Sequence, residues 1–119
     1  MKIINSDIYK VVIQLSNDNI EKQKALIRQL NNLLNELPQI TIEIVVHSDG
    51  INFLKNDHPL KNIISEFQKP NISFLACSNT IKSLQLHPAQ LFEFITIIPS
   101  GVAHLIIRQQ EGWSYLKAD

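Results

Sequence analysis

A chain of 119 residues is long enough to bury one hydrophobic core and too short for two, so we expect a single domain over residues 1–119. Hydrophobic residues make up 45% of the chain and charged residues 18%, which is typical of a folded globular protein. Eleven basic residues balance eleven acidic ones, which argues against nucleic acid or an anionic membrane as a partner, because both select a basic surface.

The amino-terminal stretch, residues 1–7, lacks the apolar segment and the small-residue cleavage site of a signal peptide. No apolar run in the sequence reaches the length that a bilayer crossing requires. The chain has one cysteine, Cys77, which cannot form an intramolecular disulfide, and free thiols are typical of a reducing compartment. We therefore expect a cytoplasmic protein.

The first third of the chain predicts a strand followed by a helix. Residues 9–15 are apolar except for Lys10 and Gln14, the near-continuous pattern of a strand covered on both faces. Residues 26–37 carry leucine and isoleucine at the spacing of one helical face, and Pro38 ends that helix.

The middle of the chain predicts a second and a third strand. Residues 41–47 are largely β-branched, and residues 48–50 close this strand as a turn. A helix entered at Pro59 is expected next, because proline suits the first helical position. Pro70 breaks that helix, and residues 72–76 form the third strand.

The last third of the chain continues the alternation. Two helical pieces are expected over residues 78–92, with Ser78 or Asn79 as the first N-cap. They are followed by a strand over residues 95–98, a helix over residues 102–111 and an edge strand over residues 113–116. This order predicts an α/β protein with a three-layer α/β/α arrangement and a mostly parallel, five-stranded sheet.

Polar segments follow four of the predicted strands, and in a parallel sheet the carboxyl ends of the strands meet at one edge, where ligands bind. A cysteine at a helix amino terminus faces unpaired N–H groups that favour the thiolate, so Cys77 is a candidate nucleophile or sulfur carrier. His47, at the end of the neighbouring strand, can orient or deprotonate a partner. The segments are residues 16–18, 47–50, 77–80 and 99–101, and the binding residues expected around Cys77 are His47, Ser78, Asn79, Thr80, Ser100 and Gly101.

Structural roles for the same residues stay open. A free cysteine often fills a small apolar gap at a strand end, and a lone histidine is usually structural or solvated. His58 and His87 each precede a proline and resemble helix-entry residues, while His104 suits a satisfied position on a helix face. The histidines and the cysteine lack the paired spacings of a zinc site, and the three glycines form no nucleotide-binding motif. The sequence therefore predicts no metal and no cofactor.

The sequence as a whole resembles the DsrE/DsrF-like proteins, small α/β domains related to sulfur-relay subunits such as the Tus and Dsr components. The resemblance begins at residues 10–13 and extends over nearly the full chain. Its most specific pieces are residues 33–38, residues 43–47 with Gly50, residues 74–80, and residues 99–103 through 108–115.

This resemblance implies a YchN-like fold with a flavodoxin-like sheet, and assembly into homotrimers or hexamers. It also implies that the cysteine at the position of Cys77 carries a persulfide passed between protein partners, a sulfur donor and a sulfur acceptor. The first hypothesis is accordingly a sulfur-relay protein, a sulfur transferase or carrier that works through Cys77. The alternative is a non-catalytic oligomeric module that binds a small ligand or a protein, and a third hypothesis is a redox sensor based on oxidation of Cys77.

Overall fold

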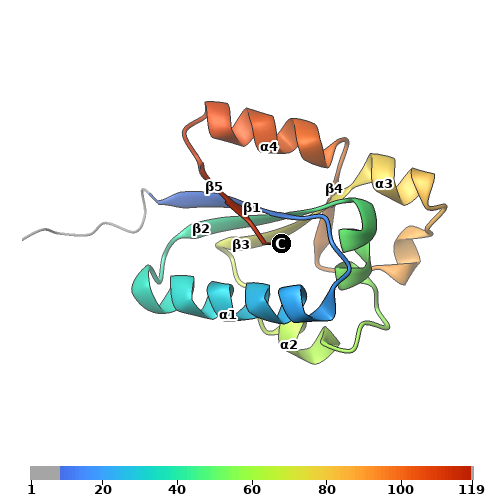
Figure 1. Ribbon diagram of the computed structural model, residues 1–119, viewed down its shortest axis with the longest axis horizontal. Helices are drawn as coiled ribbons and strands as arrows, with labels where there is room; N and C mark the ends of the chain where they lie inside the picture. The colour runs from blue at the N-terminus through green and yellow to red at the C-terminus, as the bar shows by residue number, and fades with distance from the viewer. Residues whose placement is uncertain (1–8, 119) are drawn as a thin grey trace, which may run out of the picture.

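The computed structural model describes residues 9–118, so the signal-peptide expectation for residues 1–7 lies outside the described residues. Within this range strands alternate with helices, as predicted (Figure 1). In chain order the elements are β1 (Lys10–Leu15), α1 (Ile20–Glu36), β2 (Thr41–Val46), the 3-10 helix η2 (Ser48–Leu54), α2 (Lys61–Ser65), β3 (Ile72–Cys77), α3 (Ser78–Ser83), the 3-10 helix η3 (Pro88–Gln90), β4 (Ile95–Ile98), α4 (Gly101–Gln110) and β5 (Ser114–Lys117).

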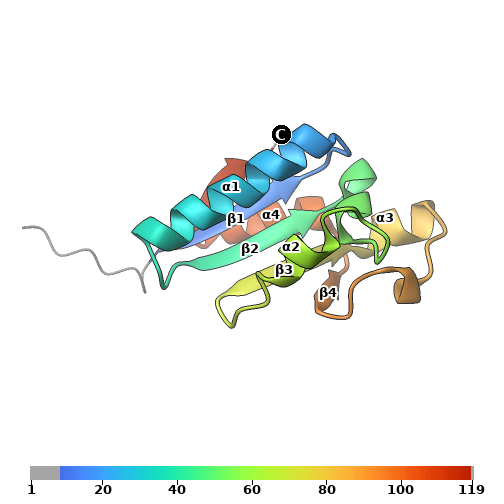
Figure 2. The ribbon, with the colours of Figure 1, turned by 90° about the horizontal axis from the view of Figure 1, so that it is seen from below.

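The five strands form one sheet in the order β4-β3-β2-β1-β5, and every neighbouring pair is parallel. The sheet prediction is confirmed, including the edge position of the last strand. The chain steps in one direction from β1 to β4 and then returns to the far edge for β5. Because parallel crossovers are right-handed, this reversal moves the connecting helix to the opposite face. Figures 1 and 2 show α1 and α2 on one face of the sheet and α4 on the other.

The alternation of side chains along each strand divides the core between these two faces. Ile13, Ile44 and Phe74 point toward the layer of α1 and α2, where the larger hydrophobic cluster lies. Val12 and Val45, which are one residue out of phase, point toward α4, together with Leu75 on β3. Gln14, His47 and Cys77 share this second phase, so the backbone directs all three toward the α4 face.

The helices that follow β2 and β3 begin differently from the sequence predictions. The segment after β2 forms the 3-10 helix Ser48–Leu54, and the following helix begins at Lys61, two residues beyond Pro59. The prediction that Ser78 or Asn79 caps α3 is wrong, because Cys77 itself occupies the N-cap position. The two helical pieces predicted over residues 78–92 are confirmed as α3 and η3.

Among the helices of residues 9–118, α4 covers one face of the sheet by itself. Of its apolar side chains, Leu105 packs into the core, whereas Val102, Ile106 and Ile107 are each more than half exposed. Much of the apolar surface of this helix therefore points away from the sheet. Throughout residues 9–118, no helix combines the length and the apolar character needed to cross a membrane.

Candidate functional site

Cys77 ends β3 and begins the turn into α3, at the carboxyl edge of the sheet where the predicted polar segments were expected to gather (Figure 1). Its backbone pairs with Ile98 of β4, and its side chain lies on the α4 face of the sheet because it shares the phase of Leu75 along β3. The residue is only 5% exposed. The thiol is therefore a nearly buried group whose chemistry depends on the polar atoms around it.

The atoms around the sulfur favour a thiolate. Burial raises the pKa of the Cys77 thiol, but hydrogen bonds from the N–H of Gly101, from the N–H and hydroxyl of Thr80 and from the N–H of Asn79 outweigh it. The net pKa of Cys77 lies below its ordinary value. These N–H groups belong to the first turns of α3 and α4, where the backbone donors have no partner inside the helix. The sulfur thus lies between two helix amino termini.

Gly101 brings α4 close to the sulfur because it has no side chain. A Cβ at this position would lie 3.4 Å from the Cβ of Cys77, 3.3 Å from the Cβ of His47 and 3.2 Å from Cγ1 of Val45. The predicted residue Ser100 has a different role, since its Oγ accepts the N–H of Ala103 at 3.2 Å and caps α4. Gly101 therefore contacts the site, and Ser100 holds the helix that carries it.

Thr80 and Ser48 join the segments that follow β3 and β2. The N–H of Ser48 donates to Oγ1 of Thr80 at 3.0 Å, and the same hydroxyl group interacts with the sulfur of Cys77. Ser48 adopts a left-handed backbone with a φ of 53°, which is uncommon for a residue with a side chain. The turn after β2 is thus shaped so that its backbone donor reaches Thr80.

His47 lies on the other side of this turn. Its Nδ1 is 2.9 Å from Oγ of Ser48, and its Nε2 is 2.8 Å from Nε2 of Gln14 in β1. Through Ser48, the imidazole is linked to Thr80 and so to the sulfur. The structure therefore brings the predicted residues His47, Thr80 and Gly101 together with Cys77.

Two small cavities flank Asn79, the residue whose N–H faces the sulfur. One cavity of about 350 Å³ lies against β4, and its lining includes Ser78, Lys82 and Ile98. The other, of about 310 Å³, lies against η2, and its lining includes Thr80. Ser78 lines one of these cavities and Asn79 lines both, and their role as binding residues stays a prediction.

The fourth predicted segment, residues 16–18, mainly supports α1 and η2. The backbone carbonyl of Asn17 accepts from Gln23 at 3.4 Å, and Oδ2 of Asp18 accepts from the amide of Asn52 at 3.1 Å. These contacts fasten the start of α1 and the side of η2. Sequence proximity to a strand end was therefore not sufficient to place this segment at the thiol.

Two polar side chains of the strands were not singled out from the sequence. Gln14 in β1 reaches His47, and Glu43 in β2 accepts hydrogen bonds from His104 at 2.7 Å and from Arg108 at 2.9 Å. Each is a polar residue within an apolar strand, and the sequence offers no other signal of these contacts. His104 is a satisfied helix-face residue, as expected from its place in the sequence.

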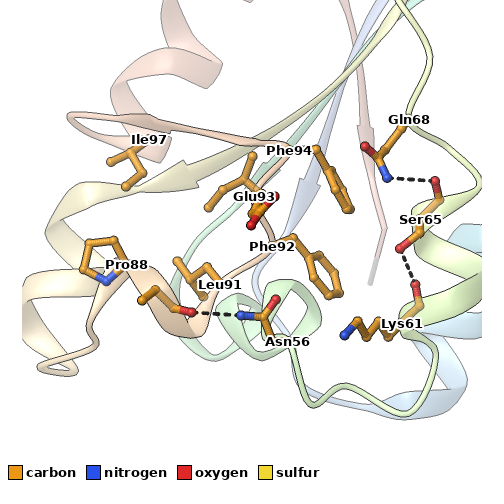
Figure 3. Close-up of a pocket in the computed structure, with 12 residues that line it drawn as sticks. Asn56, Lys61, Ser65, Gln68, Pro88, Leu91, Phe92, Glu93, Phe94 and Ile97 are labelled. Carbon is orange, nitrogen blue, oxygen red and sulfur yellow. Dashed lines mark hydrogen bonds between the residues drawn. The ribbon is translucent and has the colours of Figure 1, made fainter.

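A larger cavity lies apart from these residues, between α2, η3 and β4 (Figure 3). It has a volume of about 610 Å³, and the rings of Phe92 and Phe94 stack in its wall with centroids 5.0 Å apart. Lys61 lies on the opposite side of this cavity from the face formed by Ile97 (Figure 3). None of the predicted site residues lines it.

The model of the DsrE/DsrF-like family matches residues 9–118. The chain belongs to the DsrE/DsrF-like family. Membership implies a role related to sulfur relay at the level of the family, and it confirms the resemblance inferred from the sequence. The search of curated proteins found no match to this chain.

Solved structures that share the fold of this DsrE/DsrF-like protein include two proteins of unknown function. It is 34% identical to MTH1491, a protein of unknown function from Methanobacterium thermoautotrophicum, with a TM-score of 0.87 over 92% of this chain and 98% of that one. It is 19% identical to BT1422, a conserved protein of unknown function from Bacteroides thetaiotaomicron, with a TM-score of 0.76 over 97% of this chain and 99% of that one. The second similarity supports the fold alone.

Proposed function

We propose that this protein carries sulfane sulfur as a persulfide on Cys77. The observation that supports this most is the placement of a nearly buried thiol between the amino termini of α3 and α4, where N–H donors lower its pKa. Thiol exchange proceeds through the thiolate, so a larger thiolate fraction near neutral pH speeds attack on a sulfur donor. The same donors can hold the negative charge of a bound persulfide.

The transfer needs no oxidant or cofactor. The Cys77 thiolate attacks the outer sulfur of a donor persulfide, R–S–SH, and forms a new S–S bond while the donor S–S bond breaks. The electron pair of the broken bond leaves on the donor as the thiolate R–S⁻, and the proton stays with the transferred sulfur. An acceptor thiolate later takes this outer sulfur from Cys77 by the same exchange.

The absence of a second cysteine determines where the sulfur goes. Cys77 is the only cysteine in the chain, so no resolving thiol of the same chain can displace the sulfur, which must pass to another molecule. The two cavities that Asn79 lines begin two residues beyond Cys77 in the chain, and a donor or acceptor can approach the thiol from this side. A cytoplasmic location, where thiols stay reduced, and separate donor and acceptor proteins fit this role.

We also propose that the chain works as a homo-oligomer, a trimer or a hexamer. Val102, Ile106 and Ile107 expose apolar surface on α4, the helix that begins beside Cys77. Contiguous apolar surface of this kind is a common feature of subunit interfaces. Burial of this face between copies would place the thiol close to a subunit boundary.

Intact-protein mass spectrometry after incubation with a persulfide donor tests the carrier role. We expect the wild type to gain the mass of one sulfur atom, removable by a reducing thiol, and the Cys77→Ser variant to gain none. No adduct on the wild type, under conditions that load a control thiol of ordinary pKa, would contradict the proposal.

The cavity in Figure 3 supports a second candidate function, a non-catalytic module that binds a small ligand. Its volume of about 610 Å³ falls within the usual range for ligand pockets, and it combines stacked phenylalanine rings with the polar side chains of Lys61 and Asn56. Thermal shift measurements with a panel of small carboxylic acids separate the two functions. A shift that Cys77→Ser retains and Phe94→Ala loses would favour the binding module.

A further inference from the structure

A chain of polar contacts crosses the α4 face of the sheet and ends at the thiol. The alternation of side chains puts Gln14 and His47 on this face, and Tyr115 shares it because it pairs with Val12. From the outer edge inward, Tyr115 donates its hydroxyl proton to Oε1 of Gln14, and Nε2 of Gln14 lies 2.8 Å from Nε2 of His47. Nδ1 of His47 lies 2.9 Å from Oγ of Ser48, and the N–H of Ser48 donates to Oγ1 of Thr80 at 3.0 Å.

The orientation of the Gln14 amide, with Oε1 toward Tyr115 and Nε2 toward His47, gives the contacts one direction. The side-chain nitrogen of Gln14 can only donate, so Nε2 of His47 must accept and carries no proton. A neutral imidazole with a bare Nε2 holds its proton on Nδ1. That proton faces Oγ of Ser48, which accepts it. Gln14 thereby selects one tautomer of His47.

The inner end of the chain orients a hydroxyl group. Oγ1 of Thr80 accepts the N–H of Ser48, which occupies the oxygen on that side and leaves the hydroxyl proton to point elsewhere. The sulfur of Cys77 interacts with this hydroxyl group and can accept its proton. The left-handed backbone of Ser48 aims its N–H at Thr80, and the contact with His47 holds the Ser48 side chain in place.

We propose that Gln14, His47 and Tyr115 are positioning residues for Cys77. They hold the Ser48 turn so that the Thr80 hydroxyl donates to the sulfur, and they thereby increase the thiolate fraction on which the proposed carrier role rests. No proton moves along the contacts during sulfur transfer. The network fixes orientation and leaves the exchange chemistry to the thiolate.

A double-mutant cycle on the thiol pKa tests this assignment, with the pKa read from the pH dependence of alkylation by iodoacetamide. Thr80→Val should raise the pKa of Cys77 by about one unit, because it removes a hydrogen bond to a charged sulfur. Gln14→Leu should raise it by roughly half a unit, since it loosens the same bond without deleting it. In the Thr80→Val background, Gln14→Leu should cause no further rise.

A conservative variant and two matched controls distinguish a specific effect on the pKa of Cys77 from a general loss of stability. Tyr115→Phe removes one hydroxyl group at the surface and should raise the pKa in the same direction as Gln14→Leu. Tyr9→Phe and Gln29→Leu change a tyrosine and a glutamine away from the network and should leave the pKa unchanged. A long-range proton–nitrogen NMR spectrum should place the His47 proton on Nδ1.

Either of two results would overturn the assignment: a Gln14→Leu effect equal in the presence and absence of the Thr80 hydroxyl, or a His47 proton found on Nε2. Persulfide loading of the same proteins separates this inference from the carrier role. If the cycle is non-additive but the wild type accepts no sulfur, the positioning network stands and the carrier role fails. If the wild type accepts sulfur and the cycle is additive, the carrier role stands and the positioning network fails.

Discussion

Gly101 and Cys77 approach each other so closely that a Cβ added to Gly101 would lie 3.4 Å from the Cβ of Cys77. The same added atom would lie 3.2 Å from a methyl carbon of Val45, which is tighter than comfortable packing. The absence of a side chain at the start of α4 therefore lets one of its N–H groups reach the sulfur. A helix amino terminus and a buried thiol are brought together by one glycine.

Substitution of this glycine should weaken the thiolate. Gly101→Ala is expected to push the start of α4 away from β2 and β3, so that the pKa of Cys77 rises by roughly one unit as a donor to the charged sulfur is lost. The rate of alkylation by iodoacetamide as a function of pH measures this change. Val102→Ala, which alters the next and largely exposed residue, serves as the control. Equal pKa values in the two variants would contradict the role of Gly101.

Helix α4 is held in register by an ion pair at its other end. Arg108 donates to both carboxylate oxygens of Glu43 at 2.9 Å, and its guanidinium lies 4.6 Å from the ring centre of Trp113. Burial raises the pKa of Glu43, but the hydrogen bonds and charges of Arg108 and His104 reverse this and lower it. The carboxylate is therefore ionised and depends on its partners.

Removal of Arg108 alone should destabilise the protein more than removal of both Arg108 and Glu43. Arg108→Leu leaves Glu43 as a nearly buried charge, and we expect a loss of about 2–3 kcal/mol in the free energy of unfolding, below the value for fully buried pairs because Arg108 is partly exposed. The double variant Glu43→Leu with Arg108→Leu should recover part of this loss. Urea unfolding measures both.

Lys24→Ala provides the matched control for this experiment. It breaks the exposed pair between Lys24 and Glu21, whose charged atoms are 3.5 Å apart, and should change the stability by less than about 1 kcal/mol. A double variant less stable than Arg108→Leu alone would show that the Glu43 carboxylate is not the source of the loss.

The sequence was sufficient to predict the strands and the place of Cys77, because apolar runs broken by proline, glycine and polar clusters mark strand ends directly. It was not sufficient to predict the contacts of Gln14. A glutamine within an apolar strand shows only that one position of the strand is polar. Which residues it meets depends on the sheet order, in which β1 lies between β2 and β5.

The same limit applies to α4 and to Glu43. An apolar residue on a helix is ordinarily predicted to be buried, yet only one side of α4 meets the sheet, and Ile106 is 58% exposed. A glutamate in a strand is ordinarily predicted to face water, yet Glu43 lies beneath α4 because its partners come from residues more than sixty positions away. In both cases the environment of the side chain depends on contacts distant in the sequence.

Stability should fall in mildly acidic solution because of His58. Burial lowers the pKa of this imidazole more than the nearby carboxylates of Asp18 and Asp57 raise it. Its Nε2 lies 2.8 Å from Oε1 of Gln23, and its Nδ1 accepts the N–H of Leu60 at 3.0 Å. A protonated ring can no longer accept at Nδ1.

The direction of the pH effect follows from proton binding in the two states. Below a pH of about 6.5 the unfolded chain binds a proton at His58 that the folded chain resists, so the free energy of unfolding decreases as the pH falls through this range. Urea unfolding at a pH of about 7.5 and about 5.5 measures the decrease. His58→Asn should reduce this decrease, because asparagine has no group that gains a proton in this range. If the free energy of unfolding depended equally on pH in the wild type and in His58→Asn, this role of His58 would be contradicted.

Self-association should depend on the outer face of α4. Val102 and Ile106 are one helical turn apart and are 54% and 58% exposed, so a charge at Ile106 would lie in the centre of any interface formed there. We expect sedimentation velocity to show an oligomer for the wild type and a monomer for Ile106→Glu, because burial of an unpaired carboxylate is costly. Ile63→Glu, at an exposed isoleucine of α2, should stay oligomeric. A monomeric wild type at micromolar concentration, or an oligomer that survives Ile106→Glu, would contradict this interface.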